Sequence, residues 1–183
     1  MNHCGTKRPE TDRLVLRQYM VGDAQAMYEN WASDEKVTEF LLWKPHSDPR
    51  ETVKFLEDWT PRYSEEDYYN WAIVLKENGD NPIGNIWVGR IKEKAVSAEV
   101  GYCVGREFWH KGIASEALKA VMDFLFDEVG VNRIEAYHDP RNPYSGDVMK
   151  KCGMKYEGTL RASEWNNLGI CDAYWYSMLK SER

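Results

Sequence analysis

The stretch from Ser97 to Glu128 constrains the fold of this chain more than any other part of the sequence. It begins with an apolar run typical of a β-strand, passes through a turn, and continues near Gly112 into a pattern typical of an amphipathic helix. The first turn of a helix leaves backbone N–H groups without partners, and the helix dipole attracts negative charge there. A glycine at such a turn lets the backbone approach an anion closely. The stretch therefore predicts a strand, a turn and a helix whose N-terminus can bind phosphate.

Neighbouring residues fit the same interpretation. Lys111 adds a cation, Ala114 keeps the backbone accessible, and Glu99 places a carboxylate on the strand upstream of the turn. Glycine near a strand-to-helix turn is also common without a ligand, so ordinary turn chemistry explains these residues alone equally well. The glycine spacings of the ATP-binding and dinucleotide-binding loops do not occur here. We therefore expect neither ATP hydrolysis nor dinucleotide redox chemistry.

The composition is that of an ordinary globular protein. At 183 residues the chain can form one domain with a full-sized core. We predict a single domain over residues 1–183, with a flexible N-terminal extension over residues 1–9. The net charge is −6 and no basic tail or stripe is present, so we expect no binding to nucleic acid. An acidic balance is compatible with cationic substrates such as amines.

Signals for membranes and metals are missing from the sequence. No apolar run approaches the roughly 20 residues that cross a bilayer, and residues 1–10 lack the apolar segment of a signal peptide. The four cysteines and four histidines are scattered without paired metal-ligand spacing. We therefore expect a cytoplasmic protein with free thiols, no structural metal and no membrane association.

The rest of the chain alternates between strand and helix patterns. Strands are expected over residues 10–17, 68–76, 83–91, 97–104, 131–138, 154–160 and 172–179, and helices after Asp23, over 35–42, from Pro49, after Gly112 and over 144–152. Short turns between consecutive strands favour antiparallel hairpins. The strand–helix–strand unit around Gly112 favours one parallel pair. The pattern predicts a mixed α/β domain with a mostly antiparallel sheet.

Three motifs carry a resemblance to a known family. They are Ala98-Glu99-Val100-Gly101-Tyr102, Trp109-His110-Lys111-Gly112-Ile113-Ala114-Ser115-Glu116-Ala117, and Asn142-Pro143-Tyr144-Ser145 followed by Lys151-Cys152-Gly153-Met154. The chain resembles the GNAT superfamily of acetyl-CoA-dependent N-acetyltransferases, and most of all the Rim-type branch of ribosomal-protein N-terminal acetyltransferases. The resemblance covers nearly the whole chain. It implies the GNAT fold, in which helices flank a mixed sheet and a parallel strand pair splays around the cofactor.

The resemblance also implies a binding site for acetyl-CoA. The pyrophosphate loop of the family reads Gln/Arg-x-x-Gly-x-Gly/Ala; Gly112 and Ala114 match it, and Trp109 replaces its first residue. Backbone N–H groups of the loop are expected to hold the pyrophosphate, and these belong to His110, Lys111, Gly112, Ile113, Ala114 and Ser115. The pantetheine arm of the family lies along the splayed strand, here near Cys103 and Val104. Asn142 matches a position that bonds the pantetheine, and Ser145 matches a hydroxyl in the following helix; both are expected to contact the cofactor.

Acetyl transfer to an amine needs a base, a donor to the thioester oxygen and a group that stabilises or protonates the leaving thiolate. Glu99 is the candidate base, directly or through water; its alternative roles are a surface carboxylate or a partner of an arginine. The backbone N–H near Val104 is the expected oxyanion donor. Many relatives use a tyrosine acid where this chain has Met149. Ser145 is therefore the preferred acid, with Tyr144 second, although a serine near a helix start is often an N-cap.

The sequence predicts transfer of an acetyl group from acetyl-CoA to a primary amine in a ternary complex. The acceptor is expected to be a protein N-terminus or a small amine, and the protein a monomer or a homodimer. The alternative is a non-catalytic CoA or acyl-CoA sensor. Retention of Glu99 in the expected active strand argues against that alternative.

Overall fold

The computed structural model describes all 183 residues. It contains one sheet of seven strands in the order β1-β2-β3-β4-β5-β7-β6. The strands are Leu14–Arg17 (β1), Asn70–Leu75 (β2), Pro82–Lys92 (β3), Ser97–Val104 (β4), Arg133–His138 (β5), Lys155–Asn166 (β6) and Gly169–Leu179 (β7). β4 and β5 pair in parallel, and every other pair of neighbours is antiparallel. The predicted mixed α/β sheet with one parallel pair is confirmed.

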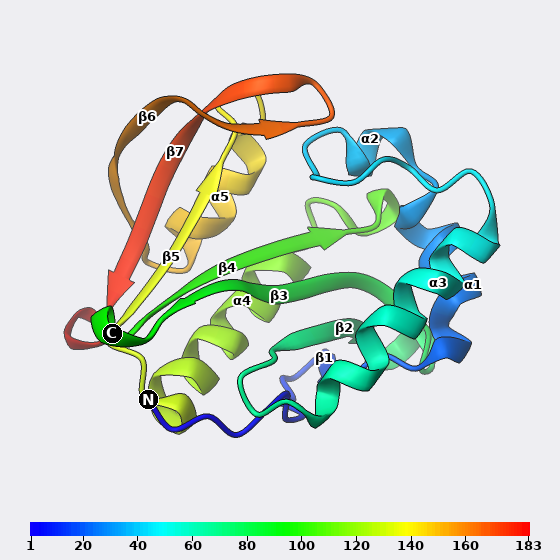
Figure 1. Ribbon diagram of the computed structural model, residues 1–183, viewed down its shortest axis with the longest axis horizontal. Helices are drawn as coiled ribbons and strands as arrows, with labels where there is room; N and C mark the ends of the chain where they lie inside the picture. Colours follow the sequence, from blue (N-terminus) through cyan, green and yellow to red (C-terminus); the bar gives the residue numbers. More distant parts are fainter.

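Helices cover both faces of the sheet (Figure 1). They are Ala24–Met27 (α1), Glu35–Thr38 (α2), Pro49–Trp59 (α3), Ile113–Phe124 (α4) and Pro143–Lys151 (α5), and a π-helical segment, Leu125–Val129, continues α4. α4 packs on one face because Ile113, Ala117 and Val121 repeat at helical spacing and are all buried. α5 lies on the same face, and α1 and α3 lie on the other. None of these helices has the length and apolar character needed to cross a bilayer.

The C-terminal hairpin is longer than the sequence predicts. β6 and β7 continue beyond the expected strands through a bulge, where the register shifts between Leu160 and Glu164. Ala162 has a positive φ of 49° there, and its N–H donates to Asp172 Oδ1 at 2.8 Å. The bulge interrupts the alternation of apolar and polar residues, so periodicity alone does not detect the outer half of the hairpin. The helix predicted over 35–42 is shorter and ends at Thr38.

β4 and β5 separate soon after they begin. Their parallel pairing covers only Ser97–Glu99 of β4 and Arg133–Glu135 of β5. Beyond this point β5 pairs with β7 alone, up to His138, while β4 continues to Val104 beside β3. The two strands diverge in Figure 1, where β4 runs toward α2 and β5 toward the hairpin. The sheet is therefore split along its parallel pair, as the family resemblance implies.

Residues 1–9, which the sequence predicts as a flexible extension, lie against the domain. The N–H of Asn2 donates to the Val129 oxygen at 2.8 Å. The Thr6 hydroxyl donates to the Tyr68 oxygen at 2.8 Å, and Thr6 is buried. The segment is thus hydrogen-bonded to both α4's continuation and the start of β2, which a polar composition does not indicate.

Candidate active site

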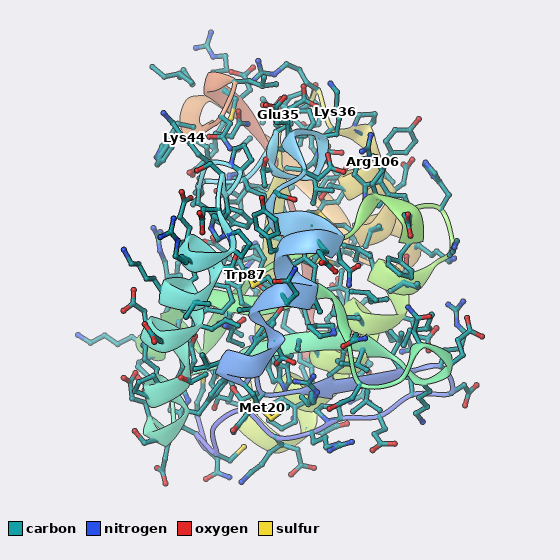
Figure 2. All side chains as sticks on the ribbon, turned by 90° about the vertical axis from the view of Figure 1, so that its right-hand side faces the viewer. Met20, Glu35, Lys36, Lys44, Trp87 and Arg106 are labelled. Atoms are coloured by element: carbon teal, nitrogen blue, oxygen red, sulfur yellow. The ribbon has the colours of Figure 1, made fainter.

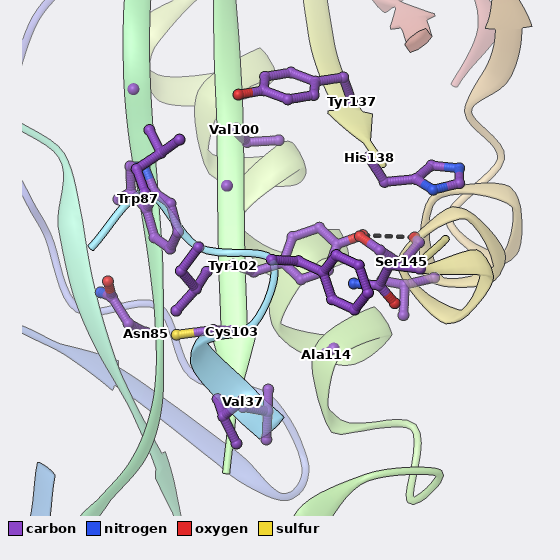
Figure 3. Close-up of a pocket in the computed structure, with 18 of the residues that line it drawn as sticks. Val37, Asn85, Trp87, Val100, Tyr102, Cys103, Ala114, Tyr137, His138 and Ser145 are labelled. Atoms are coloured by element: carbon purple, nitrogen blue, oxygen red, sulfur yellow. Dashed lines mark hydrogen bonds between the residues drawn. The ribbon is translucent and has the colours of Figure 1, made fainter. Parts of the chain in front are cut away.

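A cleft of about 1410 Å³ opens where β4 and β5 separate, and residues from both faces of the sheet line it. Side chains alternate along a strand, so Val100 and Tyr102 lie on the α4 face of β4 while Glu99, Gly101 and Cys103 lie on the α3 face. The cleft therefore passes through the sheet. One end lies beside Ala114 at the N-terminus of α4 (Figure 3), and the other reaches Phe55 and Trp59 of α3.

The α4 end of the cleft has the features of an anion site. Gly112 is the residue before the helix and has a left-handed φ of 75°. No side chain caps the helix, so the N–H groups of Ile113, Ala114 and Ser115 have no partner in the first turn. A Cβ at Gly112 would lie 3.5 Å from Lys151 Nζ and 3.6 Å from a guanidinium nitrogen of Arg13. Free amides and two cations thus surround the same point, as an anion requires.

The loop before α4 is anchored by an indole. Trp109, which replaces the first residue of the family motif, donates from Nε1 to the Val104 oxygen at 2.7 Å. His110 follows with a positive φ of 60° and packs edge-on against Tyr144, with ring centroids 4.9 Å apart. The indole bond joins the loop to the end of β4. The role of Trp109 is one that the sequence motif did not reveal.

The cleft side of β4 exposes unpaired backbone groups. The N–H of Gly105 donates to the Ile83 oxygen on β3 at 2.8 Å. Alternate residues of a strand point to opposite neighbours, and the pairing with β5 ends at Glu99, so the N–H groups of Tyr102 and Val104 point toward the gap left by β5. The indole of Trp109 occupies the Val104 oxygen but leaves the Val104 N–H available. The edge predicted near Cys103 and Val104 for the pantetheine arm is thus open.

α5 brings Ser145 against Tyr102. The Tyr102 hydroxyl donates to the Ser145 backbone oxygen at 2.7 Å and lies 3.1 Å from Ser145 Oγ. The backbone oxygen can only accept, so the single tyrosine proton points to it and the serine hydroxyl donates to Tyr102. Asn142 is the N-cap residue of α5. Its side chain makes no capping hydrogen bond to the helix and lines the cleft. Ser145 is therefore not an N-cap, and Tyr102 is a site residue that the sequence did not single out.

Glu99 lies half-buried at the α3 end of the cleft and forms no hydrogen bond or ion pair within the chain. Burial raises the pKa of its carboxyl, although the nearby charge of Arg90 opposes that rise. The charges of Glu135 and Glu164 raise the pKa further. A carboxylate that is free, partly desolvated and exposed to a cleft has the properties of a proton acceptor.

Two further site residues come from the distant strands β5 and β6. Tyr137 points from β5 toward β4 (Figure 3), and Glu164 lines the same cleft. Burial raises the pKa of Tyr137 above its ordinary value, and the charges of Glu164 and Glu99 act in the same direction. Sequence reasoning missed Glu164 because β6 was not expected to extend that far, and it missed Tyr137 because the local pattern does not show where β5 separates from β4.

Trp87 forms a flat wall between Glu99 and the rest of the α3 end. It lies on β3 opposite Gly101 of β4. A Cβ at Gly101 would come within 2.5 Å of the indole, so only glycine lets the ring lie against the strand. Cys103 is buried beyond it, and burial raises the pKa of its thiol to about 12. This thiol is therefore protonated and inert at neutral pH.

The hairpin and the α2 region meet across the mouth of the cleft. Asn167, at the hairpin turn, donates from Nδ2 to the Thr38 and Trp43 oxygens, both at 2.8 Å. Beside α2, Arg106 and Asp34 form an ion pair at 2.8 Å. Figure 2 shows Arg106 and Lys36 near α2, with Trp87 nearer the middle of the view. These contacts close the split sheet into a ring around the cleft.

Comparison with known proteins agrees with this geometry. A family model described as an acetyltransferase (GNAT) domain matches residues 13–155. The N-acetyltransferase p20 of Bacillus licheniformis is 33% identical over 175 residues, covering 94% of this chain and 96% of the relative. The [ribosomal protein uS5]-alanine N-acetyltransferase of Escherichia coli is 34% identical over 159 residues, covering 82% and 79%.

A solved structure shows the same architecture. A GNAT-family acetyltransferase from Bacillus anthracis superimposes with a TM-score of 0.82 and 25% identity, covering 96% of this chain and 100% of that one. The sequence match, the split sheet and the open N-terminus of α4 agree with one another. The chain belongs to the GNAT family of acetyltransferases, and it is an acyltransferase of the kind that uses acetyl-CoA.

Proposed function

We propose that this protein transfers an acetyl group from acetyl-CoA to a primary amine, by direct attack of the amine in a ternary complex. The observation that carries the proposal is the single cleft through the sheet, with an anion site at one end and the unpartnered carboxylate of Glu99 at the other. A cofactor and an acceptor can then approach from opposite faces and meet at the free edge of β4.

The residues of the α4 end fit the charged part of acetyl-CoA. The free amides after Gly112 and the nearby cations Lys151 and Arg13 complement a pyrophosphate. Lys111 is exposed at the same loop and adds a further positive charge. Acetyl-CoA supplies the acetyl thioester, and the open N–H groups along β4 can bind the amide groups of its pantetheine arm. The side chain of Asn142 makes no capping hydrogen bond, so it can add a further hydrogen bond to the pantetheine arm.

The reaction requires a neutral amine. Glu99 can accept the proton from an incoming ammonium group, directly or through water, because its carboxylate has no competing partner. The N–H of Val104 can donate to the thioester oxygen as negative charge develops there. Ser145 can stabilise the leaving thiolate by turning its hydroxyl proton from Tyr102 toward the sulfur, while Tyr102 stays bonded to the Ser145 backbone oxygen. Tyr144 is less suitably placed, since it is 64% exposed and its ring packs on His110.

The acceptor is proposed to be a protein N-terminus or a small amine. The uS5-alanine N-acetyltransferase acts on a protein, and its likeness to this chain supports the first of these. Glu99 and Glu164 give the acceptor end two carboxylates, which suits an ammonium group in either case. We further propose a cytoplasmic enzyme without nucleic-acid or membrane partners, as a monomer or a homodimer.

Calorimetric titration with acetyl-CoA, followed by a thiol-release assay over amines and N-terminal peptides, tests the proposal. We expect binding, and release with at least one class of acceptor. Binding without release from any acceptor would favour the CoA-sensor alternative. A lack of acetyl-CoA binding would contradict the assignment of the α4 N-terminus as the pyrophosphate site.

A further inference from the structure

The α3 end of the cleft contains a carboxamide whose orientation is fixed by its neighbours. Asn85 lies on β3 and is only 5% exposed. Its Nδ2 donates to Asn70 Oδ1 at 2.6 Å and to the Trp71 backbone oxygen at 3.0 Å. A backbone oxygen can only accept, so the amide cannot be turned round without placing two oxygens against each other. The Asn85 carbonyl oxygen must therefore point away from Trp71.

That oxygen has no hydrogen-bond partner within the chain, and it is not sealed in the core. Asn85 lines the cleft, and its oxygen is accessible from it. The side-chain polar atoms that are both fully enclosed and without a partner belong to other residues, namely Trp31, His46, His138 and Trp175. Figure 3 shows Asn85 beside Cys103, with Trp87 next along β3. Buried polar atoms without partners are rare in folded proteins, and one that faces a binding cleft is available to a ligand.

Asn85 and Glu99 lie on the same face of the sheet. Asn85 is the strand partner of Cys103, which is four residues along β4 from Glu99. At about 3.3 Å per residue, this separates the two positions by roughly 13 Å along the strand direction. The indole of Trp87 lies between them, against Gly101. The face thus offers a carboxylate, a flat apolar wall and a fixed carbonyl oxygen in a line.

A chain of contacts that begins at Asn70 holds Asn85 in this orientation. Asn70 is 3% exposed, accepts from Asn85, and donates from its own Nδ2 to Tyr68 Oη at 3.0 Å. Arg62 packs over the Tyr68 ring, with its guanidinium carbon 4.2 Å from the ring centroid. These contacts connect the carboxamide to the surface through two hydrogen bonds and one cation–π contact.

We propose that Asn85 is an acceptor-binding residue, and that its carbonyl oxygen accepts a hydrogen bond from a second N–H group of the acceptor, beyond the amine that is acetylated. This inference rests on the proposed transferase function. The acceptor class is an amine that carries another N–H donor, either an ammonium or an amide group, across an apolar spacer that lies on Trp87. A plain alkylamine leaves the carbonyl oxygen unpartnered and binds less well.

A series of linear primary amines of increasing chain length tests the inference. Members of equal length end in a methyl, a carboxamide or an ammonium group, and kcat/KM is measured for each by thiol release with acetyl-CoA. Over the lengths that reach Asn85, we expect the wild-type protein to prefer the N–H-bearing ends over the methyl end by about tenfold, chiefly through KM. In Asn85→Ala this preference should shrink toward one. Comparison of kcat/KM between the amines that end in a carboxamide and those that end in an ammonium group identifies which kind of N–H is bound.

Asn85→Asp provides a second variant of the same size, which avoids the cavity that alanine leaves; like alanine it lacks the amide donor to Asn70 and Trp71, so its folding is checked in the same way. The aspartate keeps an oxygen in the cleft and adds a negative charge, so the preference for the ammonium end over the carboxamide end should rise severalfold. Asn78→Ala, in the exposed β2–β3 turn, is the matched control and should keep the wild-type preferences. Thermal unfolding and acetyl-CoA affinity of each variant show that it is folded.

The outcomes separate the two proposals. Thiol release with no preference among the three ends in the wild-type protein would overturn the role of Asn85 and leave the transferase standing. Unchanged preferences in folded Asn85 variants would overturn it as well. No release from any acceptor would overturn the transferase and the role of Asn85 together.

Discussion

Glu99 differs from the buried carboxylates of this molecule in its lack of a partner. Asp23 pairs with Arg17, Glu135 with Lys92, and Asp139 with Arg141. Each of those pairs stabilises an ionised group inside the fold. A half-buried carboxylate that remains unpaired beside a cleft is instead costly for folding and useful for chemistry. At the scale of single residues, this contrast is the reason for assigning the base to Glu99.

The first prediction concerns turnover. Glu99→Gln removes the proton acceptor and should lower kcat/KM by roughly 10²- to 10⁴-fold, while the affinity for acetyl-CoA changes little. In the wild-type protein the rate should fall at low pH through a pKa above the ordinary 4.5 of glutamate, because burial raises it. A pH–rate profile checks this. If the low-pH limb persists unchanged in Glu99→Gln, another group is the base, and Glu164→Gln is the variant to test next.

The second prediction concerns stability. A carboxyl with a higher pKa in the folded than in the unfolded state favours folding in its protonated form, so that contribution is lost as the pH rises through the folded-state pKa. Glu99→Gln resembles the protonated form. It should therefore be more stable than the wild type at neutral pH, and the difference should vanish below the ordinary pKa of 4.5. Denaturant unfolding at both pH values measures it, with Glu77→Gln in an exposed turn as the control.

At the scale of elements, the anion site depends on how the chain enters α4. Two left-handed residues, His110 and Gly112, turn the chain sharply before the helix. The turn aims the first amides of α4 into the cleft, and the indole of Trp109 fixes the loop to β4. The site is thus a property of the strand–turn–helix unit rather than of any one side chain.

The third prediction separates strain from binding. Gly112→Ala places a Cβ on a residue with φ of 75°, and Gly130→Ala does the same at φ of 78° with open space around it. Each should cost about 1–2 kcal/mol of stability because left-handed backbone disfavours Cβ. Only Gly112→Ala should also weaken acetyl-CoA binding, by about tenfold or more. Calorimetry on both variants is the measurement, and equal affinities would contradict the site.

At the scale of the whole molecule, the cleft needs segments that lie far apart in the sequence. β4 and β5 supply the split, and α2 and the hairpin close it through Asn167. In the proposed reaction the acceptor enters from the α3 face, where Glu99 lies. The same fold of the hairpin brings Glu164 of β6 near Tyr137 of β5.

The fourth prediction tests this closure. Asn167→Ala removes both hydrogen bonds to the α2 region, so the mouth should loosen and the KM for the acceptor should rise severalfold. Acetyl-CoA affinity should stay the same because its site lies at the α4 end. Steady-state kinetics and calorimetry check the two quantities, with Asn78→Ala as the control. A parallel loss of acetyl-CoA affinity would show that the contact supports the whole cleft instead.

Much of the site was accessible from local pattern. The turn at Gly112, the strand that carries Glu99 and the start of α5 each depend on residues adjacent in the chain. The spacing of glycines and apolar residues defines such units. Asn85, Tyr137 and Glu164 were not predicted, because their importance depends on strand pairings between distant segments. The bulge near Ala162 hid the outer hairpin for the same reason.

The sequence by itself determined the mixed α/β class, the turn at Gly112 and the family, because these depend on local periodicity and short motifs. Tertiary structure alone decided which side chains share the cleft. The separation of β4 from β5 leaves the β4 amides free, and the face on which each residue lies follows from register. Glu99, Asn85 and Glu164 come together only because distant strands pair in one particular register, and a shift of one residue would turn each of them to the opposite face.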